Sequence, residues 1–103
     1  MAKLKLIANP VFKAKVLIPV AGGEPVPMEF TFKHMTKTAL DEFGKGLAQK
    51  TDADAFMEML TGWEFEEEFN KESVALLLEN YMGAALAVYD TYKTELVKTK
   101  VKN

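Results

Sequence analysis

Apolar and polar residues alternate along the first third of the chain. In the segments 12–20 and 26–32 every even position is apolar, namely Phe12, Ala14, Val16, Ile18, Val20, Val26, Met28, Phe30 and Phe32. A period of two is typical of a strand with one buried face. Gly22 and Gly23 lie between the two segments and permit a reversal of the chain. The pattern therefore predicts a β-hairpin over about residues 11–35, with Pro19 and Pro27 at edge positions or on the open side, because proline donates no ladder hydrogen bond.

After Met35 the apolar spacing becomes helical. We expect a first helix over 37–49 with Thr36 as its cap, and a second over about 53–61 with Thr51 as its cap and Gly62 as its stop. Asn70 is placed to cap a third helix. The apolar stripes of the third and fourth helices are Val74, Leu77, Leu78, Tyr81, Ala85, Leu86, Tyr89, Tyr92 and Leu96. These two helices either break at Met82-Gly83 or form one continuous helix over 71–98.

The segment 63–69 has neither period. Trp63, Phe65 and Phe69 are spaced among four glutamates, and the pattern predicts a packed loop. At 103 residues the chain has room for one hydrophobic core. We therefore expect an α+β fold in a single domain, 1–103, in which the hairpin packs on a helical part over about 36–98. The polar tail 99–103 is expected to fray.

Composition narrows the function. No apolar run approaches the roughly 20 residues that a bilayer requires, and the start of the chain lacks the features of a signal peptide. All 13 basic residues are lysine, and the segment 51–80 holds one lysine against nine acidic residues. Nucleic-acid binding usually needs a basic face with arginine for bidentate contacts. We expect an intracellular protein that binds neither membranes nor nucleic acid.

Catalytic chemistry has little support in the sequence. There is no cysteine, and the single histidine, His34, has no carboxylate near it in sequence to orient it. The run of Glu64, Glu66, Glu67 and Glu68 could in principle hold a metal, but consecutive carboxylates on a loop are usually a solvated face. The sequence predicts no catalytic residue, no metal site and no cofactor.

Protein binding is the remaining class. Aromatic residues are favoured at the centres of interfaces, and methionine adapts to varied partners. The candidate partner-binding residues are Trp63, Phe65, Phe69, Tyr81, Met82, Tyr89 and Tyr92. The alternative for Trp63 and for the methionines Met57, Met59 and Met82 is that they fill the core.

The order of these features resembles a known family. The hairpin ending in Phe30-Thr31-Phe32-Lys33-His34, the Gly62-Trp63 pair, the segment 68–72, the Leu77-Leu78-Glu79-Asn80-Tyr81 helix and the stretch from Tyr89 to Leu96 together resemble the tail assembly chaperones of long-tailed bacteriophages and prophages. The match covers nearly the whole chain. Its specificity lies in the order and spacing of the motifs, since none is diagnostic alone. Met82 stands where relatives have proline.

The resemblance implies a non-enzymatic chaperone in the host bacterial cytoplasm that is absent from the mature virion. It implies binding to the tape measure protein, a long helical protein that is insoluble alone, and help for tail tube subunits that polymerise around it. In many relatives a ribosomal frameshift adds an extension that contacts the tail tube protein. The exposed apolar faces further predict a homo-oligomer. The alternative is a structural tail or head-tail connector subunit retained in the virion.

Overall fold

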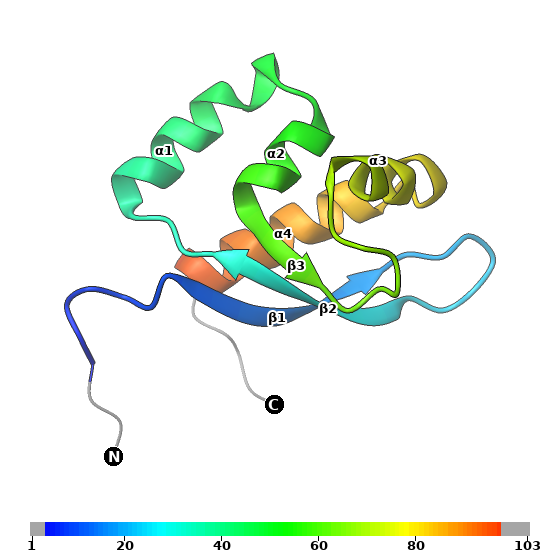
Figure 1. Cartoon of the computed structure of the whole chain (residues 1–103), viewed down its shortest axis with the longest axis horizontal. Helices are drawn as coiled ribbons and strands as arrows, with labels where there is room; N and C mark the ends of the chain where they lie inside the picture. Colours follow the sequence, from blue (N-terminus) through cyan, green and yellow to red (C-terminus); the bar gives the residue numbers. More distant parts are fainter. Residues whose placement is uncertain (1–3, 98–103) are drawn as a thin grey trace.

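The computed structural model describes residues 4–97, which form a small antiparallel sheet with helices packed on one of its faces (Figure 1). Within this range the elements in chain order are β1 (Val11–Ile18), β2 (Val26–Lys33), α1 (Lys37–Gly46), the 3-10 helix η1 (Leu47–Gln49), α2 (Asp52–Met59), β3 (Leu60–Trp63), α3 (Lys71–Asn80) and α4 (Ala84–Val97). The strand order is β1-β2-β3, so β2 is central. The α+β prediction is confirmed.

The predicted hairpin is present with the expected face buried. Val16 pairs with Met28, and Ala14 pairs with Phe30. The reversal uses Gly22, whose φ of 77° lies in the region that glycine adopts without steric cost. The buried face of the hairpin meets residues from α2, α3 and α4, and the fully buried large side chains are Phe30, Phe32, Phe56, Met59, Leu60, Val16, Val74 and Val88.

Helix starts follow their caps. The Oγ1 of Thr36 accepts a hydrogen bond from Ala39 N, and the Oγ1 of Thr51 accepts one from Asp54 N, both at 3.1 Å. The Oδ1 of Asn70 accepts from Ser73 N at 2.8 Å. All three predicted caps are confirmed. In each, a polar side chain accepts a hydrogen bond from an amide of the first turn that has no partner within the helix.

The segment after α2 differs from the sequence prediction. The second helix was predicted to reach residue 61 and to stop at Gly62, with a loop from Trp63, but the helix ends at Met59 and Leu60 begins β3. Phe30 pairs with Trp63 and Phe32 with Leu60, with an irregularity in the register between them. Residues 60–63 form a strand because the free side of β2 supplies backbone hydrogen-bonding partners. Four residues are too few for a period of two to be recognised in the sequence. The first predicted helix also changes character, since α1 stops at Gly46 and residues 47–49 are 3-10 helix.

The last two helices are separate, which settles the alternative left open by the sequence. Tyr81 N donates to Leu77 O and closes α3, and α4 begins at Ala84. Gly83 in the turn lies so close to Pro19 that a Cβ at this position would be 2.8 Å from the Cγ of Pro19. The turn is therefore held against the end of the hairpin. The predicted end of the fourth helix near Lys98 and the predicted frayed tail, 99–103, lie outside the described residues.

Pro27 occupies a place where its missing N–H costs nothing. His34 N donates to Pro10 O across β1 and β2, and Glu64 N donates to Glu29 O on the other side of β2. In an antiparallel strand the backbone N–H and C=O groups of successive residues point alternately to the two neighbouring strands. Those of the even residues of β2 therefore point to β1, and those of the odd residues point to β3. The nitrogen of Pro27 points to the β3 side, beyond the point where β3 runs. Proline is thus tolerated in a central strand, on the open side that the sequence favoured.

Candidate functional site

Three of the candidate binding residues form one aromatic cluster. The ring centroids of Trp63 lie 4.9 Å from Phe65 and 5.2 Å from Phe69, both in edge-to-face geometry. The Nε1 of Trp63 donates to the main-chain oxygen of Glu67 at 2.8 Å, which closes the loop on itself. All three rings are half-buried and pack against the core. The cluster fixes the shape of the loop and still presents part of each ring outward.

The acidic run of this loop is mainly solvated. Glu66, Glu67 and Glu68 are exposed, while a side-chain oxygen of Glu64 accepts a 2.6 Å hydrogen bond from Glu29 N. Among the described residues no three histidine or acidic side chains are grouped so that they could hold a metal ion. The structure assigns Glu64 to the sheet edge.

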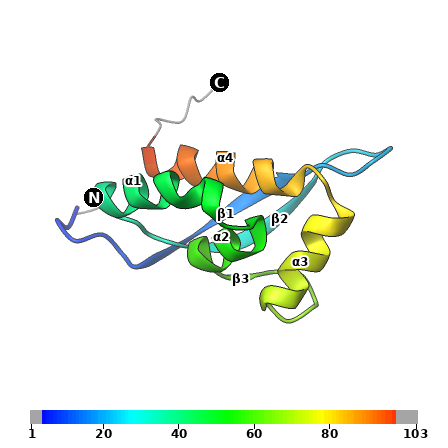
Figure 2. The ribbon, with the colours of Figure 1, turned by 90° about the horizontal axis from the view of Figure 1, so that it is seen from above.

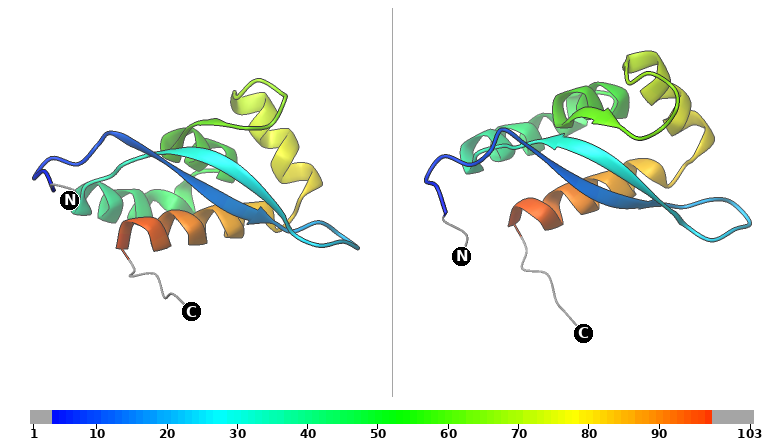
Figure 3. Two further views of the ribbon diagram at one scale, coloured as in Figure 1. Left: turned by 90° about the horizontal axis from the view of Figure 1, so that it is seen from below. Right: turned by 60° about the horizontal axis from the view of Figure 1, so that its bottom comes forward.

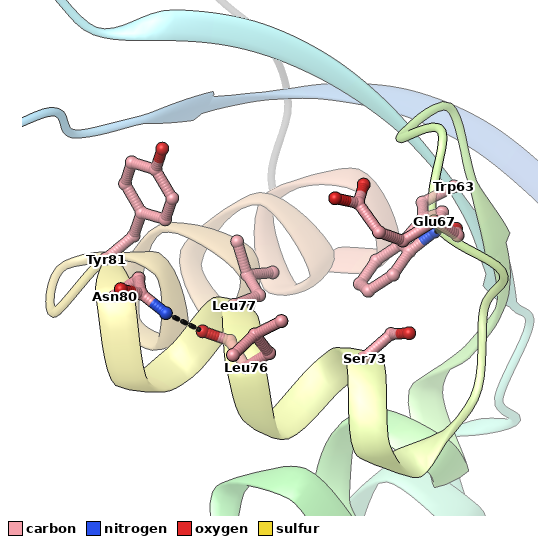
Figure 4. A pocket seen from close by; sticks show the side chains of 7 residues that line it. All are labelled: Trp63, Glu67, Ser73, Leu76, Leu77, Asn80 and Tyr81. Atoms are coloured by element: carbon pink, nitrogen blue, oxygen red, sulfur yellow. Dashed lines mark hydrogen bonds between the residues drawn. The ribbon is translucent and has the colours of Figure 1, made fainter.

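A groove lies between the loop and α3 (Figure 4), and we call it the α3 groove. Its volume is about 220 Å³, and its lining residues are Trp63, Glu67, Ser73, Leu76, Leu77, Asn80 and Tyr81. Trp63 stands at one end and Tyr81 at the other, with the leucines between them. The Nδ2 of Asn80 donates to Leu76 O at 2.9 Å, so the amide is held along the helix. The groove offers an apolar floor between an indole and a phenol ring.

Exposed apolar side chains follow along the chain from this groove, in α3, in its connection to α4 and in the first turn of α4. We call Leu76, Tyr81, Met82 and Leu86 the turn patch. Met82 is 93% exposed and Leu86 is 68% exposed. Because Gly83 packs on Pro19, the backbone that carries Met82 is fixed to the hairpin. Apolar groups on a fixed turn remain in water without collapsing onto the core, which is typical of an interaction surface.

The last two candidates, Tyr89 and Tyr92, line a second groove between α1 and α4. It has a volume of about 650 Å³ and its apolar lining residues are Leu40, Phe43, Leu47, Tyr89 and Tyr92. The hydroxyl of Tyr89 donates to the carboxylate of Asp52 at 2.8 Å. Burial, then the hydrogen bond and negative charge of Asp52, raise the pKa of Tyr89 above its ordinary value. We call this depression the α1–α4 groove.

Tyr92 lies deeper than the other candidates. Its side chain is 2% exposed and its ring stacks on Phe32 at a centroid distance of 5.2 Å. Its hydroxyl donates to Lys33 O at 2.6 Å, and burial raises its pKa to about 12. Tyr92 therefore joins α4 to the sheet and forms the floor of the α1–α4 groove.

The seven candidates thus fall in three places. Trp63, Phe65 and Phe69 form the loop cluster, Tyr81 and Met82 lie at the turn, and Tyr89 and Tyr92 face the α1–α4 groove. The sequence did not single out Leu76, which belongs to the turn patch. Its position beside the buried Leu77 and off the apolar stripe is the signal that could have found it.

One comparison with known proteins identifies the family of the chain. A family model described as phage tail assembly chaperone matches residues 1–103. The chain belongs to the phage tail assembly chaperone family. No curated protein and no solved structure matches the chain. For this tail assembly chaperone, the described part of the chain contains no helix with the length and apolar character that crossing a membrane requires. The family assigns the chain to the construction of phage tails, and exposed apolar surface suits that assignment.

Proposed function

We propose that this chaperone binds the tape measure protein through the turn patch and keeps it soluble while the tail tube assembles around it. The observation that carries the proposal is the exposure of Met82 and Leu86 on a turn that Gly83 anchors to Pro19. A long helical protein that is insoluble alone must carry apolar stripes that water does not solvate well. A fixed apolar turn can cover part of such a stripe.

The form of the surface suits a helix. The α3 groove continues the turn patch, and Leu76 and Tyr81 belong to both. A helix that lays its apolar face into a groove presents residues at spacings of three and four, and a shallow groove beside flexible methionine accepts many such faces. The half-buried Trp63 at the far end supplies a rigid aromatic contact.

The proposal extends to the remaining steps of assembly. Release of the tape measure protein to tail tube subunits would leave the chaperone in the host bacterial cytoplasm and absent from the virion. A longer frameshifted product would bring the tail tube protein close to the client. Without a client, the turn patch of one copy contacts another copy, which gives a homo-oligomer that the client displaces.

Co-expression with the tape measure protein tests the proposal. The chaperone should raise the soluble yield of that protein and co-purify with it, whereas the double variant Met82→Ser/Leu86→Ser should lose both effects. Leu17→Ser is the matched control, because Leu17 is 60% exposed on the sheet face away from the turn patch. Equal soluble yield with the parent and the double variant would contradict the assignment to the turn patch.

A second measurement separates the chaperone from a structural tail or head-tail subunit. Mass spectrometry of purified phage particles should detect tube and tape measure proteins without this chain. Its presence in particles at a fixed ratio to the tube protein would favour the structural alternative.

A further inference from the structure

The outer edge of β1 has unpaired hydrogen-bonding groups. The even residues of β1 face β2, as the bond from His34 N to Pro10 O and the hairpin register show. The amides and carbonyls of Val11, Lys13, Lys15 and Leu17 therefore point to the opposite side. Among the described residues no backbone hydrogen bond joins these four to another segment. The edge offers a complete row of donors and acceptors to an added strand.

The helix α4 packs on β1 and reaches the outer side of this edge. Seen from above and from below, α4 runs obliquely past β1, and its later turns lie on the side of β1 away from β2 (Figures 2 and 3). Tyr89 faces α2, because its ring contacts Phe56 at a centroid distance of 5.8 Å. At 100° per residue, Ala87 and Thr91 lie on the other side of α4, and both are half-exposed. A strand beside β1 would rest its inward residues on these small side chains.

The sheet face without helices is positively charged at β1, and this charge favours an acidic partner. Lys13 and Lys15 project from β1 on the face without helices, and both are exposed. Residues of an added strand that lie opposite them project to the same face, about 5 Å away. Opposite charges at such positions stabilise the pair and like charges destabilise it.

We infer that the free edge of β1 binds an extended acidic segment of a partner protein by strand addition, with Asp or Glu at alternate positions opposite Lys13 and Lys15. The segment carries small or β-branched residues at the positions between, because these rest on Ala87 and Thr91. This surface is separate from the turn patch and adds a second attachment point to the chaperone.

A second copy of the chain does not fit this edge. In the antiparallel register that pairs Val11 of one β1 strand with Leu17 of the other, Lys13 of one copy lies opposite Lys15 of its partner, and the reverse pair follows by symmetry. Four ammonium groups would then share one face. Lysine on edge strands commonly prevents pairing between identical sheets, and here it also selects an acidic partner.

The test uses a capped peptide about as long as β1, in which glutamate alternates with valine. Added to the isotopically labelled full chain, it should shift the amide signals of Val11, Lys13, Lys15 and Leu17 and slow their hydrogen exchange. The same peptide with lysine in place of glutamate should bind at least about tenfold more weakly. A third peptide, acidic but N-methylated at the alternate amides that would face β1, should not bind, because it lacks the donors of the ladder.

Charge reversal on the protein provides the matched control. Lys13→Glu/Lys15→Glu should lose the acidic peptide and bind the lysine peptide, whereas a double reversal at the exposed Lys37 and Lys45 of α1 makes the same change in net charge and should retain the parent preference. Acidic-peptide binding that shifts no β1 signal, or that survives N-methylation, would overturn strand addition, as would no binding at all. Dimerisation through β1 in sedimentation without peptide would show that a second copy occupies the edge.

Failure of the edge inference can be distinguished from failure of the proposed function. Met82→Ser/Leu86→Ser should bind the acidic peptide as the parent does, since neither residue belongs to β1 and both side chains are largely exposed. A chain that solubilises the tape measure protein but ignores the peptide refutes only the edge inference, and the converse result refutes only the proposed client site.

Discussion

The hydroxyl of Tyr92 donates a 2.6 Å hydrogen bond to the main-chain oxygen of Lys33, and this bond joins α4 to the end of β2. A hydrogen bond of this kind contributes about 1 kcal/mol net, and an unsatisfied group costs more. Tyr92→Phe should therefore lower the free energy of unfolding by about 1–2 kcal/mol in urea denaturation. Tyr81→Phe, on the exposed face of the turn, is the control and should change it by less than about 0.5 kcal/mol. Equal effects of the two substitutions would contradict the role of the Lys33 bond.

The same phenol makes stability depend on alkaline pH. Burial raises the pKa of Tyr92 from 10.0 to about 12. The neutral phenol is favoured in the folded state, so this contribution is complete below pH 10.0 and is lost as the pH rises through about 12. Tyr92→Phe has no phenol at this position and should lose less stability over that interval than the parent. Urea midpoints at a series of pH values measure the difference, and parallel declines would refute it.

Two glycines should respond to alanine in opposite directions. Gly44 is exposed within α1, and a Cβ there would meet nothing within 4 Å. Gly44→Ala should raise the free energy of unfolding by about 0.5–1 kcal/mol, because alanine loses less entropy in a helix. Gly83→Ala should lower it by about 1–3 kcal/mol, because the new Cβ would press on the rigid ring of Pro19. Thermal unfolding of both variants measures the contrast, and a shift of the same sign in both would contradict this account of the turn.

Trp63 should matter for stability through its ring and its donor separately. Trp63→Ala removes the edge-to-face contacts with Phe65 and Phe69 and should cost about 3–5 kcal/mol. Trp63→Phe keeps an aromatic ring but loses the bond to Glu67 O, and should cost about 1–2 kcal/mol. Denaturant titration of the two variants distinguishes the contributions. If alanine costs no more than phenylalanine, the ring contacts contribute little and Trp63 belongs to a binding surface alone.

Self-association should depend on the turn patch. Sedimentation equilibrium of the parent should show a homo-oligomer that grows with concentration, because Met82 and Leu86 leave water when two patches meet. Met82→Ser/Leu86→Ser should shift the equilibrium towards monomer, and Leu17→Ser should not. A strict monomer of the parent up to high micromolar concentration would rule out this form of assembly.

Interactions between neighbours in the chain were enough to predict the first two strands and the starts of three helices. The alternation from Phe12 to Phe32 defined both strands and their buried face, and Thr36, Thr51 and Asn70 marked the helix starts. These signals depend on neighbours in the chain, since a cap bonds an amide three residues away and a strand alternates within itself. The sequence left the break before α4 open, because the turn there packs on Pro19, a residue far away in the sequence.

Non-local pairing accounts for the missed strand and for the unexpected surfaces. Leu60 and Trp63 form a strand because β2 has a free side, and four residues are too few to show a period. Helical spacing placed Tyr92 on an apolar stripe but did not distinguish a deep position from a surface one. The position of Leu76 off the stripe indicates an exposed side chain, but its place in the α3 groove depends on the loop of Trp63, which helical spacing does not describe.

Pro27 makes the two margins of the sheet unequal. On the β3 side the ladder ends where a nitrogen without hydrogen faces outward, so no neighbour can extend along the full length of β2 there. On the β1 side the row of amides and carbonyls is complete. If strand addition occurs as inferred above, it is therefore restricted to the β1 side of β2, and this restriction would oppose the edge-to-edge growth of sheets into fibres.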